Sequence, residues 1–258
     1  ALAQLEETGR WDATGIGMVA KRHGGDLVIS GTKSFVVDGH TSDTLLVAIR
    51  TDEASRGAEG VSIVVVDGKA RGVARRRLET MDMTRKQAEI VFDDVRVPAT
   101  GVLGSEGSGW HAIANTTTRA VVALAFEQVG GAQKCLEMSV EYAKVRVQFG
   151  RPIGSFQAIK HKCADMLVQV ESARSAAYYA GWAVAEGDAD LAIVAPMAKS
   201  YCSEAYFHCA AENIQVHGGI GFTWEHDAHL YFKRAKTDEL LFGSPAQHRA
   251  ILADRLGL

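Results

Sequence analysis

The spacing of apolar residues changes once along this chain, and that change limits the folds available to it. From about residue 15 to residue 97, apolar residues recur with a period near two, in short runs separated by turn signals such as Gly24-Gly25 and Asp38-Gly39. From residue 111 onward they recur at spacings of three and four. The first pattern is typical of strands and the second of amphipathic helices. We therefore expect a β-domain followed by a helical domain.

The β-rich segment predicts a series of strands with no helix between them. The predicted strands are residues 17–20, 27–30, 34–37, 44–49, 61–66 and 88–92. A crossover between parallel strands needs a helical connection, and none intervenes, so the sheet should be antiparallel. We expect a small antiparallel β-barrel or β-sandwich.

The helical segment predicts an up-and-down four-helix bundle, because short turns make neighbouring helices antiparallel. The helices include Ala132 to Ala143, Ile159 to Ala177 and Val194 to Cys209, and an interrupted fourth helix runs from about Trp224 to the C-terminus. A link rich in Gly and Ser follows Val97-Pro98. The expected class is thus α+β, with a β-domain over residues 1–107 and the bundle over residues 108–258.

Composition excludes several classes of function. The net charge is −3 and the basic residues are dispersed, so we expect no nucleic-acid partner. No run approaches the ~18 apolar residues of a membrane span, and we expect no secretory leader. The cysteines fall inside helical patterns, which predicts reduced core thiols in a cytoplasmic protein. They are Cys135, Cys163, Cys202 and Cys209.

Two segments carry residues suited to an anionic ligand. The first is Arg146-Val147-Gln148-Phe149-Gly150, in which Arg146 offers the fork of donors that suits a pyrophosphate. The second is Gln215-Val216-His217-Gly218-Gly219-Ile220-Gly221-Phe222, whose bare backbone can approach a ligand and aim N–H groups at it. Each also has a structural explanation, because a cation is favourable at a helix end and glycines form helix caps and turns.

In order and spacing, the two segments together resemble the acyl-CoA dehydrogenase family, and the resemblance extends over essentially the whole chain. In that family, R-x-x-F-G and Q-x-x-G-G-x-G-F segments hold the ADP half of FAD, largely that of a neighbouring subunit. The resemblance implies FAD as cofactor, and His217 is a further candidate for its groove. The implied cofactor-binding residues are Arg146, Phe149, Gln215, Gly218 and Gly219, which should line one groove, and, in a third segment, Ser244. The chain begins where the family's middle β-domain begins, so we expect the family's helical N-terminal domain to lie outside it.

The resemblance also implies α,β-dehydrogenation of an acyl-CoA thioester to the enoyl-CoA. A carboxylate must remove the α-proton while hydride passes to the flavin. The family places this glutamate at one of two positions, which hold Phe242 and Ala120 here. The nearest carboxylates are Asp238, Glu239 and Glu127. We expect surface charge or intrahelical pairing for these three, although Glu239 becomes the base if the alignment is shifted by one helical turn.

The flavin-ring side of the family site is altered as well. Where the family has Trp-x-Thr, this chain has Phe35-Val36-Val37, and Val37 cannot donate a hydrogen bond. The family's Thr-Glu-Pro-x-x-Gly-Ser loop appears as residues 5–11, and we expect Glu6 there to be a solvated loop charge. His226 and His229 could face one side of a helix as two metal ligands, but no third ligand has suitable spacing, so we expect no metal.

Three functions remain open. We expect a base-lacking subunit that lends FAD-binding residues to a catalytic partner, within a mixed oligomer such as a dimer of dimers. The alternatives are a self-sufficient homo-oligomeric dehydrogenase with Glu239 as a displaced base, and a flavin-dependent monooxygenase of the same fold. An acyl-CoA from fatty-acid or sterol side-chain oxidation would be the substrate, and an electron-transfer acceptor would reoxidise the flavin.

Overall fold

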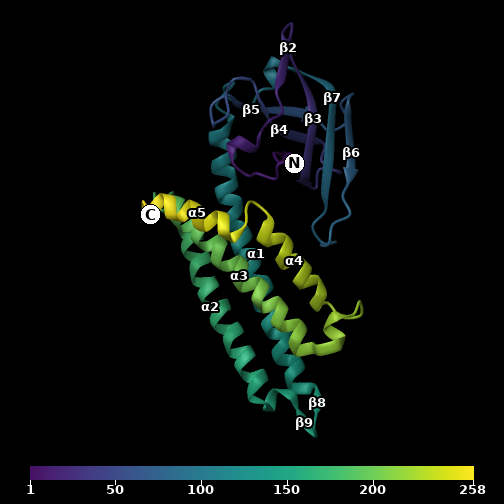
Figure 1. Cartoon of the computed structure of the whole chain (residues 1–258), viewed down its shortest axis with the longest axis vertical. Coiled ribbons are helices and arrows are strands. Elements are labelled where there is room, and N and C mark those ends of the chain that lie inside the picture. Colours follow the sequence, from purple (N-terminus) through teal and green to yellow (C-terminus); the bar gives the residue numbers. More distant parts are fainter. The chain divides into compact units, whose positions relative to one another are not determined.

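The computed structural model describes all 258 residues (Figure 1). The chain separates into two compact units, Ala1–Thr116 and Thr117–Leu258. Most of the first unit is strand and most of the second is helix, which confirms the α+β class with antiparallel sheets followed by a helical bundle. Helix α1 (Gly109–Val145) begins in the first unit and continues into the second. The domain boundary near residue 107 stays a prediction.

The first unit contains two sheets, with strand orders β1-β4-β5 and β2-β3-β7-β6. Their strands are β1 (Leu2–Ala3), β2 (Ala20–His23), β3 (Asp26–Val37), β4 (Thr44–Arg50), β5 (Val61–Asp67), β6 (Val73–Arg77) and β7 (Gln87–Pro98). Adjacent strands are antiparallel, except that the short β1 runs parallel to β4. The expectation of a wholly antiparallel sheet therefore fails at β1, because β2 and β3 come between β1 and β4 in the chain and no hairpin joins the two.

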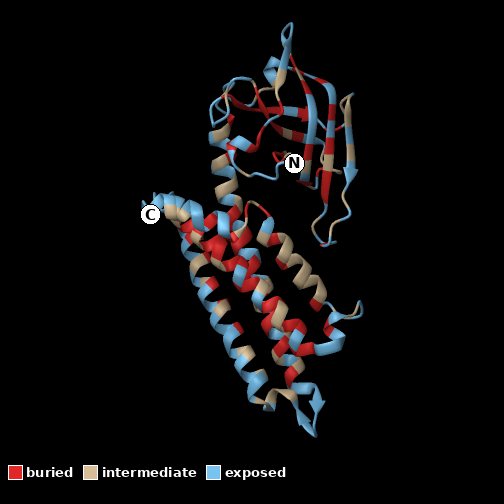
Figure 2. Cartoon of the chain, viewed as in Figure 1, coloured by how far each residue is buried: buried red, intermediate tan, exposed pale blue.

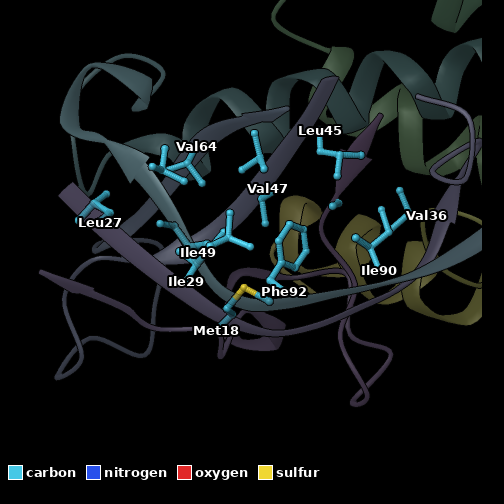
Figure 3. Packing of buried hydrophobic residues seen from close by; sticks show 14 of the residues in the cluster. Met18, Leu27, Ile29, Val36, Leu45, Val47, Ile49, Val64, Ile90 and Phe92 are labelled. Carbon is cyan, nitrogen blue, oxygen red and sulfur yellow. The ribbon is translucent and has the colours of Figure 1, made fainter. Parts of the chain in front are cut away.

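Apolar side chains of both sheets meet in one core (Figure 3). Leu45, Val47 and Ile49 alternate along β4, and Ile90 and Phe92 lie on β7 of the other sheet. All five side chains are buried. Their burial stabilises the fold by about 25 cal/mol for each Å² of apolar surface that is removed from water. The apolar residues that recur with a period of two in the sequence thus form the inner faces of a two-sheet sandwich.

Three strand predictions need correction. The runs 27–30 and 34–37 form one strand, β3, which is interrupted by irregular pairing between Ile29 and Gly31 and between Lys33 and Val36. The first predicted strand begins at Ala20 rather than at residue 17. Strand β6 was not predicted, because its sequence is rich in arginine. It lies at the edge of its sheet, where charged side chains discourage pairing with another molecule.

The second unit is built from long helices, and its fourth helix is interrupted as predicted. After α1 come α2 (Gln157–Glu186), α3 (Leu191–His217), α4 (Ala228–Leu240) and α5 (Pro245–Leu256). Helix α3 packs against α2, α4 and α5, and most of its residues are buried (Figure 2). A helix with neighbours on several sides must be apolar around most of its circumference. No helix in the chain has both the length and the apolar character to cross a membrane.

The cysteines are all free thiols, and three of them are buried in the bundle. The Sγ atom of Cys202 lies 3.4 Å from the carbonyl oxygen of Ala173, and that of Cys209 lies 3.7 Å from the carbonyl oxygen of Met166. Burial raises the pKa of Cys202 and of Cys209 to about 12 each. These thiols act as small apolar core groups, as the sequence predicts.

The free energy of unfolding is expected to fall as pH rises above 9, because unfolded thiols ionise there while Cys202 and Cys209 stay protonated until about pH 12. Each thiol contributes about 1.4 kcal/mol per pH unit to this fall. Urea denaturation at several pH values under reducing conditions measures it. Cys202→Ala should make the fall shallower by that amount, and an unchanged pH dependence in this variant would contradict the prediction.

Candidate functional site

The segment after Arg146 forms a tight hairpin at the end of α1. Strand β8 (Val147–Gln148) pairs with β9 (Arg151–Pro152), and Phe149 and Gly150 form the turn with φ values of 51° and 78°. A left-handed backbone suits glycine but costs a phenylalanine about 1 kcal/mol or more. Phe149 is nevertheless 91% exposed, so the strain brings no burial within this chain. A strained, exposed aromatic residue is suited to contact with a ligand or another subunit.

Arg146 is held by its backbone and leaves its side chain exposed. Its N–H donates to the carbonyl oxygen of Tyr142 at 2.9 Å, and its own carbonyl accepts from the N–H of Ile153 at 2.8 Å. By contrast, the nearby guanidinium of Arg151 lies over the ring of Phe156, 4.1 Å from its centroid. Arg146 is therefore the cation of this hairpin best placed to bind an anion.

The glycine segment begins where α3 ends. Gly218 has a left-handed φ of 61° and its N–H donates back to the last turn of α3, so the helix-cap explanation accounts for it. The same explanation does not cover Gly219, which has no positive φ. A Cβ added at Gly219 would meet nothing within 4 Å, so no packing in this chain requires a glycine there. Its bare backbone faces open space, as close approach to a ligand requires.

The ends of α1 and α3 lie side by side, which brings the two segments to the same end of the bundle. The ring of Tyr142 stacks on that of His217 with centroids 4.3 Å apart. One turn earlier on α1, the hydroxyl of Ser139 donates to Oδ1 of Asn213 at 2.9 Å. Arg146 follows Tyr142 by one helical turn. An exposed guanidinium and exposed glycine backbone at the same end of the bundle suit the pyrophosphate of a dinucleotide such as FAD.

The turn between α4 and α5 holds Phe242, Gly243 and Ser244. Phe242 and Gly243 have φ values of 60° and 105°. The Phe242 carbonyl accepts from Nε2 of His248 at 2.9 Å, and burial lowers the pKa of that imidazole to about 4, so it is neutral at physiological pH. Ser244 caps α5 in a capping box with Gln247. Its hydroxyl therefore already has a role in the fold, and a contact between Ser244 and the cofactor stays a prediction.

The carboxylates nearest the family's base positions are all paired with cations. Glu239 contacts Lys236 at 3.0 Å and Asp238 lies 3.6 Å from Arg234, which are the intrahelical pairs expected. Glu127 binds the same Arg234 at 2.7 Å. Asp238 is fully buried, however, so a surface role is wrong for it. Its position on the side of α4 that faces the bundle core is not visible in the local sequence.

Lys199 is a buried residue of this region that the sequence analysis missed. Its Nζ donates to Ser203 Oγ at 2.9 Å and to the carbonyl oxygens of Asp238 and Glu239 at 2.8 and 3.1 Å. Burial lowers the pKa of Lys199 to about 8. Those carbonyls end α4, directly before the turn that holds Phe242, so Lys199 fixes where that turn begins. A single lysine among the apolar positions of α3 was the available signal.

In the first unit, the position of the family's flavin-stacking tryptophan is also strained. Phe35 has a φ of 53° at the irregularity in β3 and is 51% exposed. It keeps an aromatic ring at that position, whereas Val37 offers no donor from its side chain.

The expectation for Glu6 was wrong, because this carboxylate is structural rather than solvated. Its Oε1 accepts from Nζ of Lys33 at 2.6 Å and from the N–H of Met18 at 3.1 Å, and its Oε2 accepts from the N–H of Gly17 at 2.9 Å. Lys33 is fully buried. A buried ammonium needs a counter-charge, and Glu6 supplies it.

The two-histidine metal alternative was also wrong. Helix α4 begins at Ala228, so His226 precedes it and shares no helical face with His229. The ring of His226 packs on His217, and that of His229 meets Trp224 edge-on. No group of three or more His, Cys, Asp or Glu residues in this chain could hold a metal ion.

Comparison with known proteins gives matches over both units. The family models described as acyl-CoA dehydrogenase, middle domain, and acyl-CoA dehydrogenase, C-terminal domain, match residues 1–95 and 107–257. Acyl-CoA dehydrogenase IpdE2 of Mycobacterium tuberculosis is 45% identical over 170 residues, which are 65% of this chain and 47% of that protein. The short-chain specific acyl-CoA dehydrogenase of Megasphaera elsdenii is 32% identical over 247 residues, 95% of this chain and 64% of that protein.

Among solved structures, butyryl-CoA dehydrogenase of Megasphaera elsdenii superposes with a TM-score of 0.94 at 30% identity. The superposition covers 100% of this chain and 68% of that one. The chain thus spans about half of the IpdE2 sequence and about two thirds of the Megasphaera proteins.

Proposed function

Because the chain belongs to the acyl-CoA dehydrogenase family, we propose that it serves in the α,β-dehydrogenation of an acyl-CoA thioester as a subunit that contributes FAD-binding residues but no catalytic base. A partner subunit supplies the carboxylate. The chain spans only part of the length of its relatives, so the activity and partners of the whole protein belong to this proposal.

One observation carries the proposal, which is the contrast between the base position and the cofactor segments. At the base position, Phe242 lies in a turn with a left-handed backbone that His248 holds in place, but its side chain has no ionisable group. At the cofactor segments, the polar and aromatic groups expected to bind FAD are exposed at one end of the bundle. A subunit that had lost all function would have no reason to keep Phe149 in a strained and exposed conformation.

When bound, FAD would accept a hydride from the acyl-CoA. The residues of this chain would act on its ADP half. Arg146 would bind the pyrophosphate through charge-assisted hydrogen bonds, and the backbone at Gly219 would allow close approach. Phe149 would pack against the adenosine. Neither Phe242 nor Ala120 can accept the α-proton of the thioester.

Of the two alternatives, a homo-oligomeric enzyme with Glu239 as base requires the Glu239–Lys236 pair to open. Glu239 also lies in the last turn of α4, whose carbonyl groups Lys199 holds. A flavin-dependent monooxygenase would need no such base, but no contact in the chain favours it. The mixed-subunit proposal therefore requires the least rearrangement.

The test is to express the full-length protein alone and together with a paralogue that carries the family glutamate, and to assay acyl-CoA dehydrogenation with FAD. The protein alone should be slower by on the order of 10²–10⁴, the typical value of a general base. Glu239→Gln should change neither rate. Robust turnover by the protein alone that disappears in Glu239→Gln would refute the proposal and establish the homo-oligomer.

Oligomerisation is a second expected outcome. Phe149, Phe222 and Trp224 are 91%, 78% and 73% exposed and belong to the two cofactor segments or directly follow them. Large apolar side chains concentrated on one surface mark an interface. Light scattering of the full-length protein should give at least twice the mass of one subunit, with a dimer of dimers as the expected assembly. A monomer at all concentrations would contradict this. An electron-transfer protein is the further partner that reoxidation of the flavin requires.

A further inference from the structure

Three aromatic rings meet beneath the glycine segment. The ring of His217 lies between that of Tyr142, at a centroid distance of 4.3 Å and an interplanar angle of 29°, and that of His226, at 4.3 Å and 45°. His217 is 5% exposed, although its neighbours Gln215 and Gly218 are exposed. The buried central ring, His217, therefore lies next to exposed residues of the glycine segment, between two half-buried rings.

The rings come from three separate segments of the chain. Tyr142 lies on α1 one turn before Arg146, His217 is the last residue of α3, and His226 follows the glycine segment. The N–H of Ala228 donates to Nδ1 of His226 at 3.1 Å, which fixes this ring at the start of α4. The stack thus links the arginine segment to both ends of the glycine turn.

The backbone of the glycine turn passes close to the base of the His217 side chain and to the last turn of α3. A Cβ added at Gly221 would lie 2.9 Å from Cβ of His217 and 3.0 Å from the carbonyl oxygen of Ile214. Nδ1 of His217 donates to the carbonyl of Asn213 at 2.8 Å. A carbonyl only accepts, so Nδ1 carries the proton and the orientation of the ring is fixed. The turn that contains Gly218 and Gly219 is consequently built on the position of His217.

We propose that Tyr142, His217 and His226 are positioning residues that hold the Arg146 segment and the Gly218-Gly219 turn together as one pyrophosphate-binding groove. The identity of the ligand rests on the proposed function, whereas the positioning of the turn does not. Rings suit this task because aromatic pairs are rigid and have a preferred geometry.

The charge state of His217 gives a second readout. Burial and the nearby His226 both lower the pKa of His217, against the raising effect of its hydrogen bond to Asn213. The groups that face His217 are Tyr142 from α1 and His226 from the segment before α4. A lowered folded-state pKa means that neutral His217 stabilises the stack above its ordinary pKa near 6.5, and that this stabilisation weakens as pH falls below that value.

The test compares a ring-removing and a ring-keeping substitution at two positions of the full-length protein. Tyr142→Leu and His226→Leu remove a ring, whereas Tyr142→Phe and His226→Phe keep one. Two quantities are measured, namely the affinity for ADP by calorimetry and the hydrogen exchange of the amides of residues 218–221. The ring-removing variants should weaken ADP binding and speed exchange by about 5- to 10-fold, and the ring-keeping variants should stay within about twofold of wild type. Tyr178→Leu, on the exposed face of α2, is the matched control and should change neither quantity.

Each result bears on one of the two claims. Unchanged exchange and affinity in both ring-removing variants would overturn the positioning role. If ring removal speeds exchange but the wild-type protein does not bind ADP, the result supports the positioning role and counts against the proposed function. If Tyr142→Leu does not fold, the half-buried His226 still decides the question. The exchange of residues 218–221 in wild type should also rise below pH 6.5, and that rise should be smaller in His226→Phe.

Discussion

The Phe242→Glu variant is expected to dehydrogenate an acyl-CoA thioester without a partner subunit, on the order of 10²-fold faster than the wild-type chain. The turn is already shaped, because Phe242 and Gly243 are left-handed and His248 holds the Phe242 carbonyl at 2.9 Å. Lys199 fixes the preceding end of α4. A glutamate at position 242 would therefore require no change in the backbone conformation of the turn.

Phe242→Gln is the matched control, because its side chain has the same length and no basic group, and it should remain at the wild-type rate. The measurement is initial dehydrogenation rate at equal FAD content in all variants. A folded, FAD-loaded Phe242→Glu protein that is no faster than Phe242→Gln would show that residue 242 is not the base position. Adding Val37→Thr should raise the rate of Phe242→Glu further, because it restores a donor that the family has and this chain lacks.

The Lys199→Met variant is expected to lose about 3 kcal/mol of unfolding free energy at pH 7. The substitution removes the Lys199 donor from the carbonyl oxygens of Asp238 and Glu239 in the bundle interior, whereas Ser203 Oγ still accepts from Gln128. It also removes a cation near the fully buried Asp238. Relief from burying a charge offsets part of this loss, but the two carbonyl oxygens that lose their lysine donor outweigh it.

Chemical denaturation measures this difference, with Lys236→Met as control. Lys236 pairs with Glu239 but is 40% exposed, so its loss should cost less than about 1 kcal/mol. The pH dependence is a further check. The pKa of Lys199 is about 8 in the folded protein and 10.5 ordinarily, so its contribution to stability rises with pH between these values. The gap between wild type and Lys199→Met should widen over that range, and a constant or narrowing gap would contradict the role assigned to Lys199.

The hydrophobic period predicted the fold because burial of one face of each element depends on local spacing alone. Leu45, Val47 and Ile49 alternate in the sequence and point into one core, as expected. The irregularities were not predictable in this way. Strand β6 has no apolar alternation, because it lies at a sheet edge, and the parallel pairing of β1 depends on a partner more than 40 residues away.

The residues of the candidate site likewise fall into two groups, those whose role could be predicted from the sequence and those whose role could not. The segments around Arg146 and Gly218 are contiguous in sequence, so their chemistry and their family resemblance could be read directly. Glu6, Lys199 and His226 could not be assigned, because each takes its role from a residue on another element. Glu6 looks like a loop charge until Lys33 is seen beside it, and His226 looks like a metal ligand until its ring is seen on His217.

The sequence by itself thus determined the order of the two units, the family, and the absence of a carboxylate at positions 242 and 120. The tertiary structure alone decided that the Arg146 and glycine segments lie at one end of the bundle and that Lys199 holds the end of α4 before residue 242. The physical reason is the distance along the chain over which each kind of interaction acts. Side-chain identity and period act between neighbours in the chain, whereas burial of a charge or the stacking of two rings depends on which distant segments the core brings together.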